Sequence, residues 1–301
     1  MDLRLAPART LGRTGVQVPL VGYGTAPLGK KWFKGDATRC LNHAIDRGIT
    51  YLDTSPDYGS EPYVGEVMKT RRDEVFLATK VNNRRKETVL DEIKESLKKL
   101  QTHYVDLIQV HAVNAFADLE MALAEDGTLA ALEQARDEGL VRYIGITGHA
   151  RPEILAEALR KYPFDTVLVA IGMADRLVTA PDRFLLPVAR EKNAGVIAMK
   201  VLGHGEFPNV NLALRYSLGL EGVSLAIVGM DNTDQIDEIV EIAANYTPLS
   251  ESEEAQLIEQ VKPLVQKDYE ESQKGAGSLF WLHDSNVMGW KQQDEPALVN
   301  Y

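Results

Sequence analysis

Apolar residues along the chain alternate between two spacings, one typical of strands and one typical of helices. Short, largely apolar runs of four to six residues predict strands that are buried on both faces. Eight such runs occur, at Leu20–Tyr23, Ile49–Leu52, Val75–Ala78, Val105–Val110, Tyr143–Ile146, Thr166–Ala170, Val196–Met199 and Leu225–Val228. The pattern therefore predicts eight short strands that follow one another along the chain.

Between these runs, apolar residues recur every three or four positions, which predicts amphipathic helices. Three of these helical faces are Val89, Leu90, Ile93, Leu97 and Leu100, then Ile154, Leu155, Ala158 and Leu159 after Pro152, and finally Ile236, Ile239, Val240 and Ala243. Alternation of buried strands with such helices predicts a parallel sheet with helical crossovers. Eight repeats in 301 residues match a closed (β/α)8 TIM barrel of the α/β class.

One domain, 1–301, is expected, because barrels of this length form single domains. The barrel itself is expected over about residues 9–267. Ahead of the first strand, Leu11–Val18 contains Gly12 and Gly15 and predicts an N-terminal β-hairpin, which is placed to cap the bottom of the barrel. After Lys267 the apolar period fades, so residues 268–301 are expected to form an extended C-terminal tail.

The composition argues against partners that carry many negative charges. The chain is 45% hydrophobic and 26% charged, and its formal net charge is -11. Because like charges repel, neither nucleic acid nor a membrane surface is an expected partner. Residues 1–10 lack an apolar leader segment, and no run is long enough to cross a bilayer, so we expect a cytoplasmic protein. The lone Cys40 allows no intrachain disulfide, and the histidine spacing predicts no metal site.

Four polar residues lie at or just beyond the ends of successive predicted strands. Asp53 follows the second apolar run and Tyr58 lies in the loop after it. Lys80 follows the third run and His111 follows the fourth. In a barrel these strand ends converge on the face that carries the chemistry. An ammonium lowers the pKa of a nearby phenol, a carboxylate keeps the ammonium charged, and a neutral imidazole donates to a carbonyl oxygen, so the set is suited to reducing C=O groups.

Other interpretations of these residues remain open. Taken singly, Asp53 suits the cap of a turn, Lys80 suits a solvent-exposed residue at a strand end, and His111 suits a polar residue with its hydrogen bonds satisfied. Their joint placement at successive strand ends favours catalysis instead. Lys80 as the Schiff-base nucleophile of an aldolase is an enzymatic alternative that leaves Tyr58 less well explained. The segment Gly24–Lys30 has the spacing of a phosphate-binding P-loop, but it lacks the serine or threonine that would hold magnesium.

From about Arg9 to Pro263 the chain resembles the aldo-keto reductase family. The similar segments surround the four polar residues and the opening hairpin, at Leu52–Gly59, Ala78–Lys80, Gln109–His111 and Thr10–Gly15. The resemblance implies that Tyr58 is the general acid and that Lys80 and Asp53 tune it. It further implies that His111 orients the carbonyl and that a nicotinamide cofactor delivers hydride without a metal.

Departures from the family gather at positions that the resemblance assigns to the cofactor. Thr147-Gly148 replaces a serine-asparagine pair, Leu168 replaces a glutamine, and Met199 stands where a tyrosine would lie beneath the nicotinamide. These differences indicate a subgroup with altered nicotinamide contacts. The positions implied for cofactor binding are Gly24, Thr25, Asp53, Thr147, Gly148, Met199, Lys200, Leu202, Gly229, Asn232, Thr233 and Gln235.

The stretch Gly229–Gln235 lacks the lysine and arginine that bind the 2′-phosphate in NADPH-dependent members of the family. Asp231 and Asp234 would repel that phosphate, so NADH as well as NADPH is a candidate cofactor. Asn232 and Thr233 open a predicted helix whose N–H groups could meet a cofactor phosphate. Asn232 is equally suited to a simple N-cap.

Loops on the same face are expected to form the substrate pocket. The candidate pocket residues are Trp32, Phe33, Asn114 and Trp281, with Phe116 nearby. Trp281 and Trp290 are equally suited to docking the tail onto the barrel. Polar neighbours suggest a hydroxylated substrate such as a sugar, and they are Asp57, His149, Lys200 and His204.

The expected function is therefore that of an NAD(P)(H)-dependent oxidoreductase. It would transfer hydride between nicotinamide and an aldehyde or ketone, or the corresponding alcohol. One alternative is a non-catalytic barrel that senses nucleotide, which the altered cofactor contacts favour and the intact four-residue set opposes. The other is a sugar-modifying enzyme of epimerase or lyase type with tightly bound NAD. The sequence sets no expectation for the oligomeric state.

Overall fold

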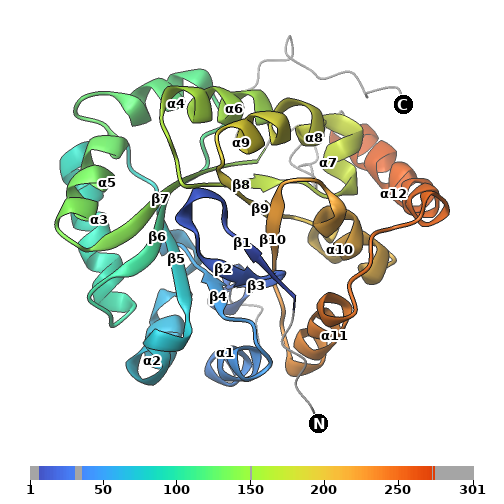
Figure 1. The fold of residues 1–301 in the computed structure, drawn as a ribbon, viewed down its shortest axis with the longest axis horizontal. Helices are drawn as coiled ribbons and strands as arrows, with labels where there is room; N and C mark the ends of the chain where they lie inside the picture. Colours follow the sequence, from blue (N-terminus) through green and yellow to red (C-terminus); the bar gives the residue numbers. More distant parts are fainter. Residues whose placement is uncertain (1–6, 31–35, 150, 273, 275–301) are drawn as a thin grey trace.

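Eight parallel strands form a closed barrel in the computed structural model, which describes residues 7–30, 36–149, 151–272 and 274 (Figure 1). Each strand pairs with its neighbours in chain order, and β10 closes the barrel against β3. The strands are β3 Val21–Gly24, β4 Tyr51–Asp53, β5 Phe76–Val81, β6 Val105–Val110, β7 Val141–Gly148, β8 Thr166–Ala170, β9 Gly195–Met199 and β10 Val223–Val228. All eight predicted strands are confirmed, with ends within three residues of the prediction.

Helices surround the barrel and connect successive strands (Figure 1). Local sequence sets where they begin: the Asp36 carboxylate accepts from Arg39 N at 2.9 Å and caps α1. Pro152 occupies the first turn of α6, as predicted. The α-helices of the described residues are α1 Ala37–Asp46, α2 Glu61–Arg71, α3 Lys86–Lys99, α4 Phe116–Leu123, α5 Thr128–Asp137, α6 Pro152–Lys161, α7 Met173–Val178, α8 Pro181–Phe184, α9 Leu186–Glu191, α10 Val210–Gly219, α11 Thr233–Ala244 and α12 Glu251–Ser272.

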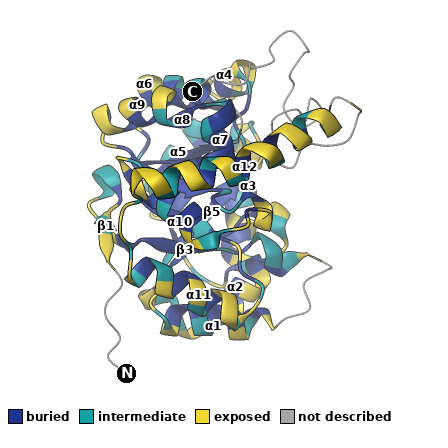
Figure 2. Ribbon diagram, turned by 90° about the vertical axis from the view of Figure 1, so that its right-hand side faces the viewer, coloured by how far each residue is buried: buried dark blue, intermediate teal, exposed yellow. Residues whose placement is uncertain are grey.

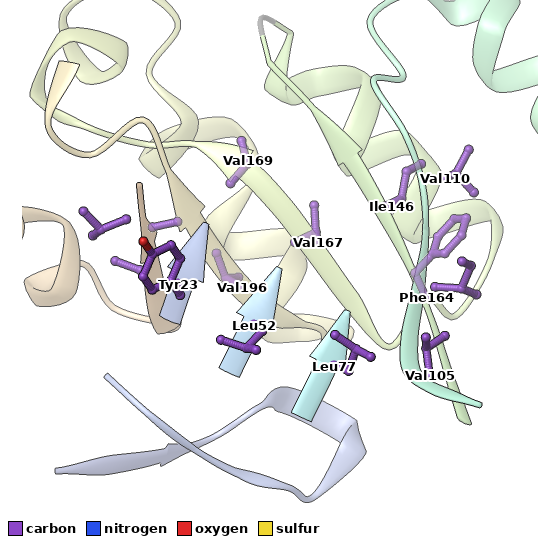
Figure 3. Close-up of a cluster of buried hydrophobic side chains, with 14 of the residues drawn as sticks. Tyr23, Leu52, Leu77, Val105, Val110, Ile146, Phe164, Val167, Val169 and Val196 are labelled. Carbon is purple, nitrogen blue, oxygen red and sulfur yellow. The ribbon is translucent and has the colours of Figure 1, made fainter. Parts of the chain in front are cut away.

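Apolar side chains fill two regions, one inside the barrel and one between the barrel and its helices. Tyr51 belongs to the inner cluster, whereas Leu52 and Leu77 belong to the outer one, which Figure 3 shows. Successive residues of a strand point to opposite faces, so β4 alternates between the two regions. The same alternation turns Asp53, the residue after Leu52, toward the inside of the barrel.

A hairpin closes the N-terminal end of the barrel. Its parts are β1 Ala8–Thr10, the short 3-10 helix η1 Gly12–Thr14, and β2 Gln17–Pro19, which pairs antiparallel with β1. Leu11 is fully buried in the inner cluster, and a Cβ on Gly195 of β9 would lie 2.7 Å from its Cδ1. The predicted hairpin is confirmed, although Leu11–Val18 forms mainly the connection, because the first strand lies before it and only Gln17 and Val18 within it are paired.

Helix α12 packs across α7 and α10 on the outside of the barrel, and Figure 2 shows its outer side exposed. Leu257, Val261 and Val265 form its buried stripe, which continues to Asp268. The predicted start of the tail at residue 268 therefore falls inside a helix. The rest of the predicted tail, residue 274 apart, lies outside the described residues.

Candidate active site

Three neighbouring strands end side by side at the C-terminal end of the barrel and carry candidate catalytic residues. Asp53 is the last residue of β4, Lys80 stands one residue before the end of β5, and His111 directly follows β6. Tyr58 ends a short 3-10 helix, η3 Pro56–Tyr58, in the loop after β4. The structure thus brings all four sequence-predicted residues to one end of the barrel.

Asp53 and Lys80 form a buried ion pair. Lys80 Nζ lies 2.5 Å from Asp53 Oδ1 and also donates to the backbone oxygen of Thr54 at 2.7 Å. Both charged side chains are only 1% exposed. Burial by itself would lower the pKa of Lys80, but the Asp53 carboxylate and the Tyr58 phenol outweigh it and raise the pKa above its usual value. Lys80 is therefore charged at neutral pH.

Gln109 of β6 completes the hydrogen bonding of Asp53. Its Nε2 donates to Asp53 Oδ2 at 3.0 Å, so each carboxylate oxygen has a donor. Gln109 is fully buried, and its Oε1 has no partner among the described residues. We did not predict a role for Gln109 from the sequence. An amide within an apolar strand was the available signal, because a buried polar group requires a hydrogen-bond partner.

The Tyr58 phenol lies next to the Lys80 ammonium, with Nζ 4.6 Å from the ring centroid. A Cβ on Gly29 would lie 1.9 Å from the backbone oxygen of Tyr58, so only glycine allows this close approach of the two loops. Burial raises the pKa of Tyr58, and the Lys80 charge offsets that rise only in part. The lysine acts in the direction expected from the sequence, but burial dominates. Tyr58 therefore carries its proton at neutral pH.

His111 stands edge-on to Tyr58, with ring centroids 6.1 Å apart and ring planes at 81°. Its Nδ1 lies 2.6 Å from Oδ1 of Asn82 and 3.7 Å from Oδ1 of Asp57. Burial, followed by the nearby Lys80 charge, lowers the pKa of His111 to about 3. The imidazole is consequently neutral at neutral pH.

Side chains of α3 and α4 anchor the loop after β5, which lies next to His111. Glu92 of α3 accepts from the backbone N of Asn82 at 2.9 Å. Arg84 forms an ion pair with Asp118 of α4 at 2.6 Å and donates to the backbone oxygen of His111 at 2.5 Å. These contacts escaped sequence analysis because they depend on how the loop folds back from the strand end.

Comparison with known proteins identifies the family to which the chain belongs. The Aldo/keto reductase family model matches residues 20–211. The chain belongs to the aldo-keto reductase family. It is 30% identical to the L-galactose dehydrogenase of Arabidopsis thaliana over 309 residues, which cover 85% of this chain and 96% of that one. It is 31% identical to the D-threo-aldose 1-dehydrogenase of Pseudomonas sp over 228 residues, 64% of this chain and 68% of that one.

A solved structure agrees with this assignment. The aldo-keto reductase AKR11C1 from Bacillus halodurans, in its holo form, is 27% identical and superposes with a TM-score of 0.71. The match covers 85% of this chain and 96% of that one. The protein is accordingly an aldo-keto reductase enzyme, an oxidoreductase.

Three positions that the resemblance assigned to the cofactor of this aldo-keto reductase support the surrounding loops. Thr25 donates to the backbone oxygen of Asp53 through both its N and its Oγ1, each at 2.9 Å. The Thr147 hydroxyl accepts from the backbone N of Ala112 at 3.0 Å. A Cβ on Gly148 would lie 2.7 Å from a backbone oxygen in the loop after β6. These contacts hold the loops in place whether or not the same residues also touch a cofactor.

The end of β9 presents an apolar residue followed by a lysine. Met199 is 6% exposed and packs in the inner cluster with Leu168. Lys200 follows with a φ of 61°, a left-handed conformation that is uncommon outside glycine. Burial lowers the pKa of Lys200 to about 8, so most of its ammonium remains charged at neutral pH. Leu202 then directly precedes the 3-10 helix η5, Gly203–Gly205, as its N-cap residue.

Side chains of the loop Gly229–Gln235 accept hydrogen bonds from the backbone of the same loop. Asn232 Oδ1 accepts from the backbone N of Gln235 at 2.9 Å and caps α11, so its N-cap role is confirmed. Gln235 Oε1 accepts in turn from the backbone N of Asp231 at 2.7 Å. Asp231 Oδ1 is buried and has no hydrogen-bond partner in the described part of the chain. A buried acceptor is therefore available at this end of β10.

Of the predicted pocket residues, Asn114 lies at the mouth of the barrel, the end at which the parallel strands finish. Its Oδ1 accepts from the backbone N of His149 at 2.8 Å, and the His149 ring lies 6.4 Å from that of His111. Phe116 is 44% exposed at the start of α4. Trp32, Phe33 and Trp281 lie outside the described residues.

The described residues contain neither a metal-binding cluster nor a membrane-spanning helix. Within residues 7–30, 36–149, 151–272 and 274, no group of three or more His, Cys, Asp or Glu side chains is arranged to hold a metal ion. None of the helices described there combines the length and the hydropathy that crossing a membrane requires.

Proposed function

We propose that this aldo-keto reductase transfers hydride between the nicotinamide of NAD(P)(H) and an aldehyde or ketone, or the corresponding alcohol, with Tyr58 as the proton donor. The observation that supports this most strongly is the charged Lys80, 4.6 Å from the Tyr58 ring centroid and 2.5 Å from Asp53 Oδ1. A phenol is a weak acid at neutral pH, so proton donation requires a cation that stabilises the phenolate left behind.

In the reduction, Tyr58 gives its hydroxyl proton to the substrate oxygen, and the carbonyl becomes an alcohol. A nicotinamide held by the residues named below would supply the hydride to the carbonyl carbon. Lys80 stabilises the resulting phenolate, which then regains a proton from solvent. Asp53 and Gln109 hold the lysine in place, and His111 orients the substrate beside the phenol. Oxidation of the alcohol follows the same steps in reverse.

The loop after β10 suits the adenosine end of the cofactor. Asp231 Oδ1, a buried acceptor without a partner among the described residues, matches the 2′-hydroxyl of NAD, which has a proton to donate. A 2′-phosphate would meet the same carboxylate as a like charge. We propose that the cofactor is held by Gly24, Thr25, Asp53, Thr147, Gly148, Met199, Lys200, Leu202, Gly229, Asn232, Thr233 and Gln235, with Asp231 at its 2′ position.

A sugar or another polyhydroxylated compound is the proposed substrate. The relatives from Arabidopsis thaliana and Pseudomonas sp are named as dehydrogenases of L-galactose and of D-threo-aldoses. Polar groups at the mouth, such as Asn114 and His149, supply hydrogen-bonding partners for hydroxyl groups.

Parallel calorimetric titrations with NADH and NADPH, followed by spectrophotometric assays with aldoses and simple aldehydes, test this function. We expect nucleotide binding and turnover of at least one carbonyl or sugar. Binding of neither nucleotide would contradict the proposal. Cofactor that survives purification, together with no net turnover of external NAD(P)H, would instead support the alternative with tightly bound NAD.

Changing the loop after β10 should alter the choice between NADH and NADPH. The double variant Asp231→Ala with Gln235→Arg removes the repelling carboxylate and adds a guanidinium that can bind a 2′-phosphate. We expect the kcat/KM ratio of NADPH to NADH to rise by about tenfold or more, which corresponds to roughly 1.4 kcal/mol. Glu238, exposed on α11 beyond this loop, provides the matched control, since Glu238→Ala should leave the ratio nearly unchanged. An unaltered ratio in the double variant would place 2′ recognition elsewhere.

A further inference from the structure

Ser60 is the N-cap residue of α2, but its side chain does not cap the helix. Its backbone oxygen accepts from the backbone N of Val64 at 3.1 Å, whereas its hydroxyl makes no capping bond. Serine is favoured at N-caps because its hydroxyl can accept from a free N–H of the first helical turn. Ser60 is also fully buried, and a buried hydroxyl requires a hydrogen-bond partner. Helix capping therefore does not explain this serine, and its partners lie elsewhere.

Thr54, Ser60 and Thr25 form a hydroxyl chain that ends on the backbone of Asp53. Ser60 Oγ lies 3.0 Å from Thr54 Oγ1 and 2.9 Å from Thr25 Oγ1. Thr25 Oγ1 donates to the backbone oxygen of Asp53 at 2.9 Å. Each hydroxyl has a single proton, so Ser60 must donate to Thr25, and Thr54 must donate to Ser60. The direction of every bond in the hydroxyl chain is thereby fixed.

The bond from Ser60 to Thr25 joins two loops at the mouth of the barrel. Ser60 lies two residues after Tyr58 in the loop after β4, whereas Thr25 directly follows β3. Gly29, in the same loop as Thr25, packs on the backbone of Tyr58, since a Cβ there would lie 1.9 Å from the Tyr58 oxygen. One hydrogen bond and one close contact thus hold the Tyr58 loop against the loop after β3.

The other end of the hydroxyl chain contacts Lys80. The backbone oxygen of Thr54 accepts from Lys80 Nζ at 2.7 Å, and the Thr54 hydroxyl donates to Ser60. Lys80 Nζ lies in turn 4.6 Å from the centroid of the Tyr58 ring. Ser60 therefore links Thr54, which helps to hold the ammonium, to the loop that packs on the backbone of Tyr58.

We propose that Ser60 is a positioning residue for the reduction, because its hydroxyl holds the Tyr58 loop against Thr25 and so keeps the phenol beside the Lys80 ammonium. The inference rests on the proposed role of Tyr58 as the proton donor. A phenol that moves away from the ammonium is a weaker acid, and one that moves away from the substrate oxygen cannot reach it. Ser60 acts through Tyr58 alone.

Ser60→Ala should lower kcat for carbonyl reduction about tenfold and change nucleotide affinity by less than about threefold. Thr25 keeps both of its bonds to the backbone oxygen of Asp53, so only the Tyr58 side of the contact is released. Single-turnover assays and calorimetric titration measure the two quantities. Ser224→Ala is the matched control, because it removes a buried hydroxyl that donates to the backbone oxygen of Thr10 at the opposite end of the barrel. Its kcat should equal that of the wild type, and an equal loss in both variants would contradict the proposal.

The pH profile separates positioning from a general loss of stability. The charged and titratable groups around the Tyr58 phenol are Lys80 of β5, Asp53 of β4, Asp57 of η3 and His111 after β6. Among the charged groups only Lys80 lowers the pKa of Tyr58, so a phenol released from the ammonium should have a higher pKa. Alcohol oxidation requires the phenolate, and its kcat profile in Ser60→Ala should move by about 0.5 pH toward higher pH. Ser224→Ala should keep the profile of the wild type.

A double-mutant cycle with Thr25→Val tests whether the two hydroxyls act together. Valine keeps the shape of threonine but loses the same bond, so Thr25→Val alone should also lower kcat. The double variant with Ser60→Ala should then be no slower than the slower single variant. Losses that multiply would contradict the proposal, as would a wild-type kcat and pH profile in Ser60→Ala. A wild type that reduces no carbonyl, or full activity in Tyr58→Phe, would instead contradict the proposed function itself.

Discussion

Tyr58→Phe is expected to lower kcat for carbonyl reduction by about 10²–10⁴-fold, the usual contribution of a positioned proton donor. The phenyl ring preserves the contact with Lys80 Nζ, 4.6 Å from the ring centroid, but it has no proton to give. Nucleotide affinity should remain close to that of the wild type, because the change removes a group that acts in the transition state. Single-turnover assays and calorimetric titration measure the two quantities separately.

Tyr63→Phe is the matched control for that variant. Tyr63 is 45% exposed on α2, and the loss of its hydroxyl should leave kcat unchanged. Full activity in Tyr58→Phe would refute its assignment as the acid. A parallel loss of nucleotide affinity would indicate that the phenol supports the fold of the mouth rather than the chemistry.

Asp53→Ala should cost about 3–5 kcal/mol in the free energy of unfolding, because it leaves a buried ammonium without its counter-charge. Lys80 is 1% exposed, so water cannot take the place of the carboxylate. In the wild type the raised pKa of Lys80 means that the pair stabilises the fold fully below the unfolded value of about 10.4. In the variant the carboxylate no longer opposes burial and only Tyr58 does, so the pKa of Lys80 should fall and the deficit should shrink as the pH rises toward 10.

Urea denaturation of Asp53→Ala at several pH values measures this effect. Asp73→Ala, which removes an exposed carboxylate on the loop before β5, should change the free energy of unfolding by less than about 0.5 kcal/mol at every pH. A deficit below about 1 kcal/mol in Asp53→Ala, or one that grows with pH, would show that Lys80 finds another partner.

The strands and the four polar residues were predictable because both depend on spacing along the chain. Buried runs such as Val105–Val110 need no knowledge of their neighbours, and the structure returns that strand with the same ends. Once the barrel is predicted, the place of Asp53 or Lys80 at a strand end follows from chain order alone.

The supporting residues were not predictable, because their roles depend on contacts between segments far apart in the sequence. Gln109 meets Asp53 only through the register of three strands, and Asn82 meets His111 only through the anchoring of its loop by Glu92. The net pKa of Tyr58 likewise depends on how deeply the ring is buried, which spacing does not report. Sequence analysis thus predicted which four polar residues lie together but not the groups that orient them.

The hairpin that seals the N-terminal end of the barrel has a consequence for the order of events in turnover. Because Leu11 fills that end, we expect cofactor, substrate and product to enter and leave at the opposite end, where the candidate catalytic residues lie. Because the ligands use the same end of the barrel, their release is sequential. The molecule bound nearer the opening must leave before the one bound deeper can exchange. We therefore expect product inhibition patterns that indicate ordered rather than random binding and release.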